Sequence, residues 1–355
     1  MKEREYNYEL LRIISMIAVM MIHVSGTWVY GFTEYTASGG DVQDLLNPVA
    51  SCLYNTLSRF AVPCFVMISG AFMLDSDKTA DYATFYKQAF YKVGIPTLVF
   101  SVLYILLRIV SSIVLGTNTV GNFITIAKDA LMGSPYYHMW YMYMLVGVYC
   151  LAPVVMHFKN SIRYESFRKV AFVFLVWAIL SRWTTGSMKL NWDLGQAFEY
   201  LGYFMVGYVL RKDLKKSQVK AVIAILLGIG IEVGTALLQY KLQIVNGVME
   251  YQLNYKLVTP YSPTIALASV FIFAGFTMLH VNGKAWISKL SDMSFFMYLF
   301  HAGVWDVLCK LVCLTKGEEY LIYTMNNIYW IPIFILAVFI ISFILTAIVK
   351  STKHK

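Results

Sequence analysis

Residues 10–30 constrain the fold of this chain most, because they form an apolar run long enough to cross a lipid bilayer. A membrane-spanning helix needs about 20 mostly apolar residues. The run nevertheless contains Arg12 and His23, and a charged side chain at the bilayer centre costs about 2.5–3.5 kcal/mol or more. On a helix, eleven residues bring His23 back to within about 20° of Arg12 and place it about 16 Å further along the axis. The spacing therefore predicts that both side chains share one face of a first spanning helix.

Two interpretations of this pair stay open at this point. In the first, Arg12 snorkels to the membrane boundary and His23 is an ordinary packing histidine. In the second, both residues are functional, which is the default for ionisable residues inside a membrane. The polar residues of the other spans decide which interpretation is favoured.

Composition excludes a soluble globular protein. The chain is 59% hydrophobic and 14% charged, whereas a soluble domain is about 25% charged. We expect an all-α polytopic membrane helical bundle of about ten transmembrane helices, forming a single domain over residues 1–355 with no appended soluble domain. The expected spans are 10–30, 48–74, 93–115, 138–157, 170–185, 197–211, 219–240, 262–280, 293–313 and 328–349.

The net charge of +9 is distributed as a topology signal. Lys and Arg concentrate at both ends of the chain and in every second loop, so the positive-inside rule places both termini in the cytoplasm. This pattern argues against a nucleic-acid partner. The five cysteines form no CxxC pair, so neither a zinc site nor a disulfide framework is predicted.

The second span carries Arg59 near its middle, at about the depth of His23, and Pro63 four residues later. Proline lacks the N–H that would bond the Arg59 carbonyl, so a cation and a freed acceptor are expected together. Irregular backbone at this depth is tolerated only in a protein-lined or wet cavity. The alternative is a simple proline kink with Arg59 paired to a nearby carbonyl.

Three further residues draw attention at or inside spans. His138 is expected at the external boundary among tyrosines typical of an aromatic belt, and is a candidate for acceptor binding or acid–base chemistry. Glu199 is expected at the same edge, where its ordinary role is a solvated anchor. Glu232 lies deeper in its span, and the sequence assigns it no partner.

The ninth span contains Ser294, Tyr298 and His301, whose spacings of four and three place them on one helical face. A polar stripe in an apolar helix predicts a hydrogen-bonded seam with another helix, and a structural role for that seam is favoured. We keep the three residues as candidates for a supporting role.

Taken in order, these motifs resemble the bacterial acyltransferase-3 family of membrane O-acyltransferases. The resemblance covers nearly the whole chain. It rests on Arg12-x10-His23, RFAVPCFVMISG, HMWYMYMLVGVYCLAP, YLGYFMVGYVL and MSFFMYLFHAGV. Some members have two arginines spaced R-x-x-R in the second span, where this sequence has Arg59 alone, so the contacts to the donor are expected to differ.

The resemblance implies a multi-pass enzyme of the bacterial plasma (inner) membrane. Such an O-acetyltransferase moves an acyl group, usually acetyl, from cytoplasmic acyl-CoA to a hydroxyl of a cell-envelope or extracellular glycan, or of a lipid-linked saccharide. Acetyl-CoA is then a donor substrate, and no cofactor is bound permanently. In the family, the positions of His23 and Arg12 are the expected catalytic and donor-handling pair.

We accordingly expect Arg12 and Arg59 to bind acyl-CoA and His23 to act as the general base on the acceptor hydroxyl. Burial and the nearby Arg59 are expected to keep His23 neutral. A covalent acyl-histidine step stays open. So do a transporter or flippase of a small solute or glycan, because polar midplane residues also mark translocation paths, and a scaffold without activity. The acceptor glycan and the acyl group are not specified by the sequence.

Overall fold

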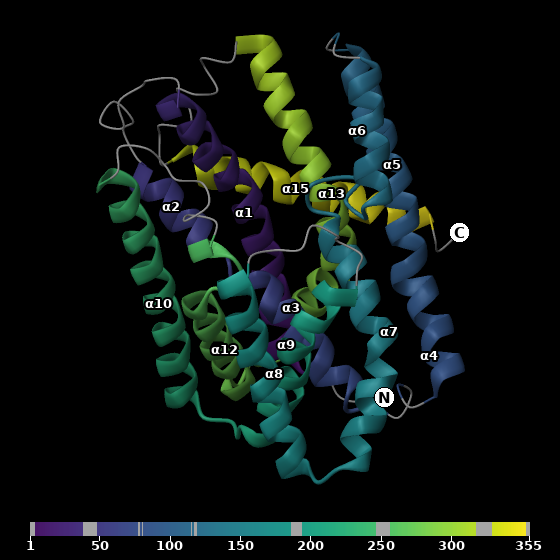
Figure 1. Cartoon of the computed structure of the whole chain (residues 1–355), viewed down its shortest axis with the longest axis vertical. Coiled ribbons are helices and arrows are strands. Elements are labelled where there is room, and N and C mark those ends of the chain that lie inside the picture. Colours follow the sequence, from purple (N-terminus) through teal and green to yellow (C-terminus); the bar gives the residue numbers. More distant parts are fainter. Residues whose placement is uncertain are drawn as a thin grey trace. The chain divides into compact units, whose positions relative to one another are not determined.

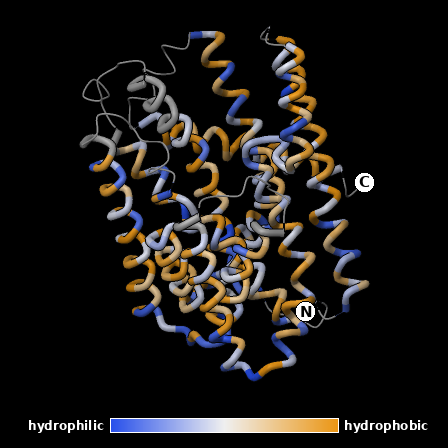
Figure 2. Tube along the Cα trace, in the orientation of Figure 1, coloured by the Kyte–Doolittle hydropathy of each residue, from blue (hydrophilic) through white to orange (hydrophobic). Residues whose placement is uncertain are grey.

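The computed structural model describes residues 4–37, 48–76, 79, 81–114, 116, 119–185, 194–245, 256–316 and 329–352. The elements in these ranges are all helical, which confirms the predicted fold class (Figure 1). Hydrophobic residues occupy most of the length of the helices (Figure 2). Eight segments of the described chain are long and apolar enough to cross a membrane. The count of ten spans and the cytoplasmic position of the termini stay predictions.

Contacts divide the chain into two compact units. Unit 1 comprises Met1–Phe65 and Asp213–Lys355, and unit 2 comprises Val66–Lys212. The single domain expected from the sequence stays a prediction. The helices of unit 1 are α1 (Tyr6–Ala37), α2 (Pro48–Thr56), the start of α3 (Ala61–Met73), α10 (Gln218–Val245), α12 (Pro263–Met278), α13 (Ala285–Lys316) and α15 (Trp330–Thr352).

Unit 2 contains the rest of α3 and the helices between it and α10. They are α4 (Tyr82–Ala89), the π-helix η3 (Phe90–Gly94), α5 (Ile95–Val114), α6 (Val120–Leu131), α7 (Trp140–Ser161), α8 (Tyr164–Thr185) and α9 (Leu194–Asp213). The two shortest predicted spans, 170–185 and 197–211, fall on α8 and α9. Both are helices, but neither is among the eight segments that meet the length and hydropathy requirement for a span.

The core of unit 1 is formed by α1, α13 and α15. Its fully or nearly fully buried members are Met16, Met20, Val24, Met293, Met297, Val304, Trp305, Ile331 and Val338. The α1 residues of this set recur every four positions, so they form one apolar stripe of the helix. This packing fixes α1 against α13, the two helices that carry His23 and His301.

Within unit 1, α10 and α12 pack side by side (Figure 1). Their approach depends on Gly228 and Gly275. A Cβ at Gly228 would lie 2.9 Å from the Ala268 carbonyl oxygen, and a Cβ at Gly275 would lie 2.8 Å from that of Ala221. Small residues at such crossings let two membrane helices pack backbone to backbone, and this contact fixes the position of α10 beside α12.

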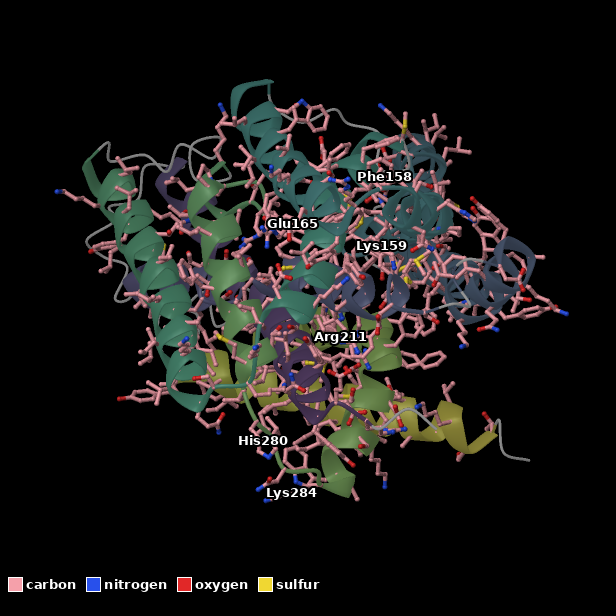
Figure 3. All side chains as sticks on the ribbon, turned by 90° about the horizontal axis from the view of Figure 1, so that it is seen from below. Phe158, Lys159, Glu165, Arg211, His280 and Lys284 are labelled. Atoms are coloured by element: carbon pink, nitrogen blue, oxygen red, sulfur yellow. The ribbon has the colours of Figure 1, made fainter. Side chains whose placement is uncertain are left out.

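In unit 2, basic side chains of α7 and α9 close the C-terminal end of α3. Lys159 Nζ donates to the Leu74 carbonyl at 2.5 Å, and Arg211 Nη1 donates to the Ala71 carbonyl at 2.9 Å (Figure 3). The last carbonyls of a helix have no partner inside the helix, so cations placed there satisfy them. Arg211 also forms an ion pair with Asp75 at 2.9 Å. These bonds fix the end of α3 in unit 2.

Candidate functional site

The candidate site lies in unit 1, where α1 and α13 run parallel and polar side chains join them in register. The joining bonds run from Ser288 Oγ to Glu9 Oε2 at 2.9 Å, from Arg12 Nη1 to Ser291 Oγ at 3.2 Å, and from Trp305 Nε1 to Thr27 Oγ1 at 3.0 Å. The paired residues are 278 or 279 positions apart in the sequence. This near-constant offset means that each level of α1 faces the same level of α13. The face that Arg12 and His23 were predicted to share is therefore the face against α13.

His23 and His301 meet within this seam. Their ring centroids are 5.1 Å apart and their planes are inclined by 38°. His301 is buried, and His23 is half-buried. His301 Nδ1 lies against the Tyr298 carbonyl, three residues earlier in α13. A proton on Nδ1 satisfies that carbonyl and leaves Nε2 of His301 as a hydrogen-bond acceptor.

Arg59 is held near His23 by Asn55. Its Nε donates to Asn55 Oδ1 at 3.0 Å, and its Nη2 donates to the same oxygen. Asn55 Nδ2 in turn donates to the Ile22 carbonyl at 3.1 Å and to Ser25 Oγ at 3.2 Å, on the turn of α1 that carries His23. Arg59 lies close enough to His23 for their charges to interact. The common depth predicted for these two residues thus corresponds to a common site.

The second span is interrupted where Arg59 lies. Residues 57–60 separate α2 from α3 and form turns with bonds between residues three apart. Pro63 accounts for the position of the break, because it offers no N–H to the Arg59 carbonyl. The Phe60 N–H also leaves the helical pattern and donates to Glu232 Oε1 of α10 at 3.0 Å. A side chain from a different helix therefore completes the backbone of the broken span.

Sequence reasoning missed Asn55 and gave Glu232 no partner. Asn55 precedes Arg59 by four residues, so the i,i+4 rule of helix faces could have found it. Glu232 is fully buried, and its bond to Phe60 joins residues 172 positions apart. Nothing in the local sequence around Glu232 encodes that contact.

The other predicted residues of the seam occupy the expected face of α13. Ser294 and Tyr298 are buried, with 2% and 6% of their surface exposed. Ser294 Oγ donates to the Ser291 carbonyl at 2.7 Å within its own helix, while Ser291 Oγ receives the bond from Arg12. Ser294 and Tyr298 thus support α13 at the level between Arg12 and His301.

His138 and Glu199 belong to unit 2. His138 lies two residues before the start of α7 and is 1% exposed. Its ring packs edge-on against Tyr104, Tyr136 and Tyr137, with centroids 4.9, 5.8 and 5.8 Å away. Glu199 lies half-buried on α9. His138 is thus buried inside an aromatic cluster, and its expected position at the external membrane boundary stays a prediction.

The site in unit 1 combines groups that can move a proton with groups that can bind an anion. An imidazole takes up and releases protons near neutral pH, and a guanidinium binds phosphate or stabilises an oxyanion. Arg12, half-buried, lies about 16 Å along α1 from His23, so the guanidinium and the imidazole occupy different levels of one seam. Among the described residues, no group of three or more His, Cys, Asp and Glu is arranged to hold a metal ion.

One known protein family matches most of this chain. A family model described as an acyltransferase domain matches residues 5–347. The matched region includes α1, α13 and the interrupted second span, and therefore every residue of the site in unit 1. No curated protein and no solved structure matches the chain.

Proposed function

The chain belongs to the acyltransferase-3 family and is a membrane acyltransferase, and from this premise we propose its donor, acceptor and catalytic residues. The donor is cytoplasmic acyl-CoA, with acetyl as the acyl group, and the acceptor is a hydroxyl of a cell-envelope or extracellular glycan or lipid-linked saccharide. The bacterial plasma membrane is the proposed location. The observation that supports the proposal most is the His23–His301 pair with Arg59 beside it.

In the proposed reaction, His23 is the general base. It removes the proton from the acceptor hydroxyl as the hydroxyl oxygen attacks the thioester carbonyl carbon. The tetrahedral oxyanion faces the Arg59 guanidinium, which stabilises the developing charge. The carbon–sulfur bond then breaks, and His23 returns the proton to the leaving thiolate. The products are the ester and free CoA.

His301 is proposed to orient His23. With the Nδ1 proton directed to the Tyr298 carbonyl, Nε2 of His301 would be the acceptor for a hydrogen bond from the ring N–H of His23 during the reaction. This arrangement would leave the other His23 nitrogen as the base. Arg12 would hold the phosphates of CoA at the cytoplasmic end of the same seam, and the slender pantetheine arm would extend toward His23.

The proposal is tested with purified full-length protein in nanodiscs, radiolabelled acetyl-CoA and an envelope extract as acceptor. We expect the wild type and His280→Ala to label the glycan, since His280 is an exposed loop residue (Figure 3). His23→Ala, with an unchanged melting temperature, should not. Full acylation by His23→Ala would refute the assigned base.

Transport of a small solute or glycan is the second candidate, because one observation also fits it. Transporters bind their substrates at interrupted membrane helices, and the second span is interrupted at residues 57–60. Dependence on the thioester separates the two functions. Movement of an envelope saccharide across a vesicle membrane without acyl-CoA, and without release of CoA, would support transport instead.

A further inference from the structure

The peptide group between Arg59 and Phe60 lies at the break in the interrupted span. The Arg59 carbonyl has no helical partner, because Pro63 has no N–H to donate. The Phe60 N–H of the same peptide donates to Glu232 Oε1 at 3.0 Å. The orientation of this one peptide determines the direction in which the Arg59 side chain leaves the backbone. Glu232 therefore acts on Arg59 through the main chain, whereas Asn55 acts on it through the guanidinium.

Burying the Glu232 carboxyl costs more free energy than burying an apolar side chain at the same position would. Its surface is fully buried, and a buried carboxyl must be compensated by hydrogen bonds or charge. Its second oxygen, Oε2, has no hydrogen-bond partner among the described residues. Arg59 lies near enough for its charge to act on the carboxylate. An apolar residue would fill the same volume at lower cost, whereas the carboxyl offers an acceptor oxygen to the backbone at the break.

A second polar contact joins α10 to the interrupted span, at the end of α2, and provides a comparison. Gln239, two turns further along α10, has its Oε1 3.0 Å from Thr56 Oγ1 at the end of α2. Both side chains are buried. This contact holds α10 against α2 but does not involve the peptide of Arg59. A residue that merely packs the helices should therefore behave as Gln239 does.

We propose that Glu232 is a positioning residue for Arg59: by accepting the Phe60 N–H, it fixes the backbone at the break and so holds the guanidinium at His23. Only the test that measures acyl transfer rests on the proposed function. The contact itself predicts a structural effect that is measurable without activity. The essential feature is the acceptor oxygen, so glutamine at this position should preserve it.

The first experiment measures hydrogen–deuterium exchange of the full-length protein in nanodiscs. Glu232→Leu removes the acceptor, and we expect faster exchange confined to peptides that contain residues 57–62. Glu232→Gln, which keeps an amide oxygen at the same place, should exchange like the wild type, as should Gln239→Leu in that segment. Unchanged exchange in Glu232→Leu, or equal acceleration in Gln239→Leu, would overturn the proposal.

The second experiment measures kcat and KM for acetyl-CoA turnover in the same variants and in an Arg59→Gln background. We expect Glu232→Leu to lose at least tenfold in kcat/KM and Glu232→Gln to stay within threefold of wild type. If Glu232 acts through Arg59, Glu232→Leu causes no further loss once Arg59 is glutamine. Independent, multiplying losses in that double variant would overturn the proposal.

The two experiments separate failure of the inference from failure of the proposed function. A wild type that turns over no acyl-CoA refutes the donor, and the exchange experiment still decides the role of Glu232 at the break. Normal turnover by a well-folded Glu232→Leu variant refutes the positioning role and leaves the acyl-transfer proposal intact.

Discussion

His23 of α1 and His301 of α13 face each other at one level of two parallel helices, with ring centroids 5.1 Å apart. The bonds from Arg12 to Ser291 and from Trp305 to Thr27 lie at other levels of the same helix pair. The histidines are thus fixed by contacts at both ends of the seam. Two imidazoles held in this way are suited to controlled proton transfer, because the helix packing already fixes their relative position.

His301→Ala is expected to lower kcat for acyl transfer by about 10²-fold, the lower end of the range for acid–base groups. The KM for acetyl-CoA should change little, because His301 lies at the level of His23 and not at that of Arg12. Steady-state kinetics of nanodisc samples provide the measurement, with the exposed His280→Ala as control. A fully active His301→Ala variant would remove His301 from the proposed mechanism.

Asn55→Leu is expected to reduce turnover about 10-fold to 100-fold, because loss of a hydrogen bond to a charged group corresponds to about 1.5–3 kcal/mol. Arg59→Lys should have a similar effect, since an ammonium cannot reproduce the two guanidinium bonds to Asn55 Oδ1. Ser58→Ala is the matched control, because Ser58 Oγ bonds to carbonyls of its own helix turn. Equal activities of Asn55→Leu and Ser58→Ala would contradict the bracing role of Asn55.

Arg12→Gln is expected to raise the KM for acetyl-CoA about 10-fold to 100-fold while kcat stays within a few-fold of wild type, since phosphate contacts bind ground state and transition state alike. Arg4→Gln is the control. Arg4 is 48% exposed and pairs with Glu9 and Asp292 near the start of the same helix pair. A parallel rise in KM for both variants would show general charge attraction and not a phosphate site at Arg12.

Gly70→Ala is expected to destabilise the protein by about 1–3 kcal/mol or more, the range for overpacked sites. A Cβ at Gly70 would lie 1.7 Å from the Phe204 carbonyl oxygen, so α3 and α9 would have to separate. Gly230→Ala in α10 meets nothing within 4 Å and should be neutral or stabilising by up to about 1 kcal/mol. Thermal unfolding in detergent measures both; equal melting temperatures would refute the close packing of α3 on α9.

The helices and their apolar faces could be predicted from local pattern, because each spanning segment carries its own signal of length and hydropathy. The same holds for the break in the second span, since Pro63 dictates which carbonyl loses its partner. The common face of Arg12 and His23 and that of Ser294, Tyr298 and His301 follow from helical periodicity. These predictions depend on residues at most eleven positions apart.

The partners of these faces could not be predicted in the same way. His23 contacts His301, and Phe60 contacts Glu232, and both pairs are far apart in the sequence, the second by 172 positions. Such pairings depend on which apolar helices pack together in the bilayer. The sequence of one helix does not specify its neighbour, because lipid-facing surfaces are chemically similar. His138 shows the same limit: Tyr136 and Tyr137 resemble an interfacial belt in sequence, but together with Tyr104 of α5 they pack edge-on against its ring.

The register of α1 with α13 has a consequence for how the protein is made. The two members of each pair are separated by 278 or 279 residues, so the ribosome completes the second member roughly 15–55 s after the first, at about 5–20 residues per second. During that interval Arg12 and His23 stay in the nascent first helix without their final neighbours. A chain released before α13 has inserted would leave these polar groups exposed in the membrane. Membrane quality control could then recognise the incomplete chain by the same residues that later form the site.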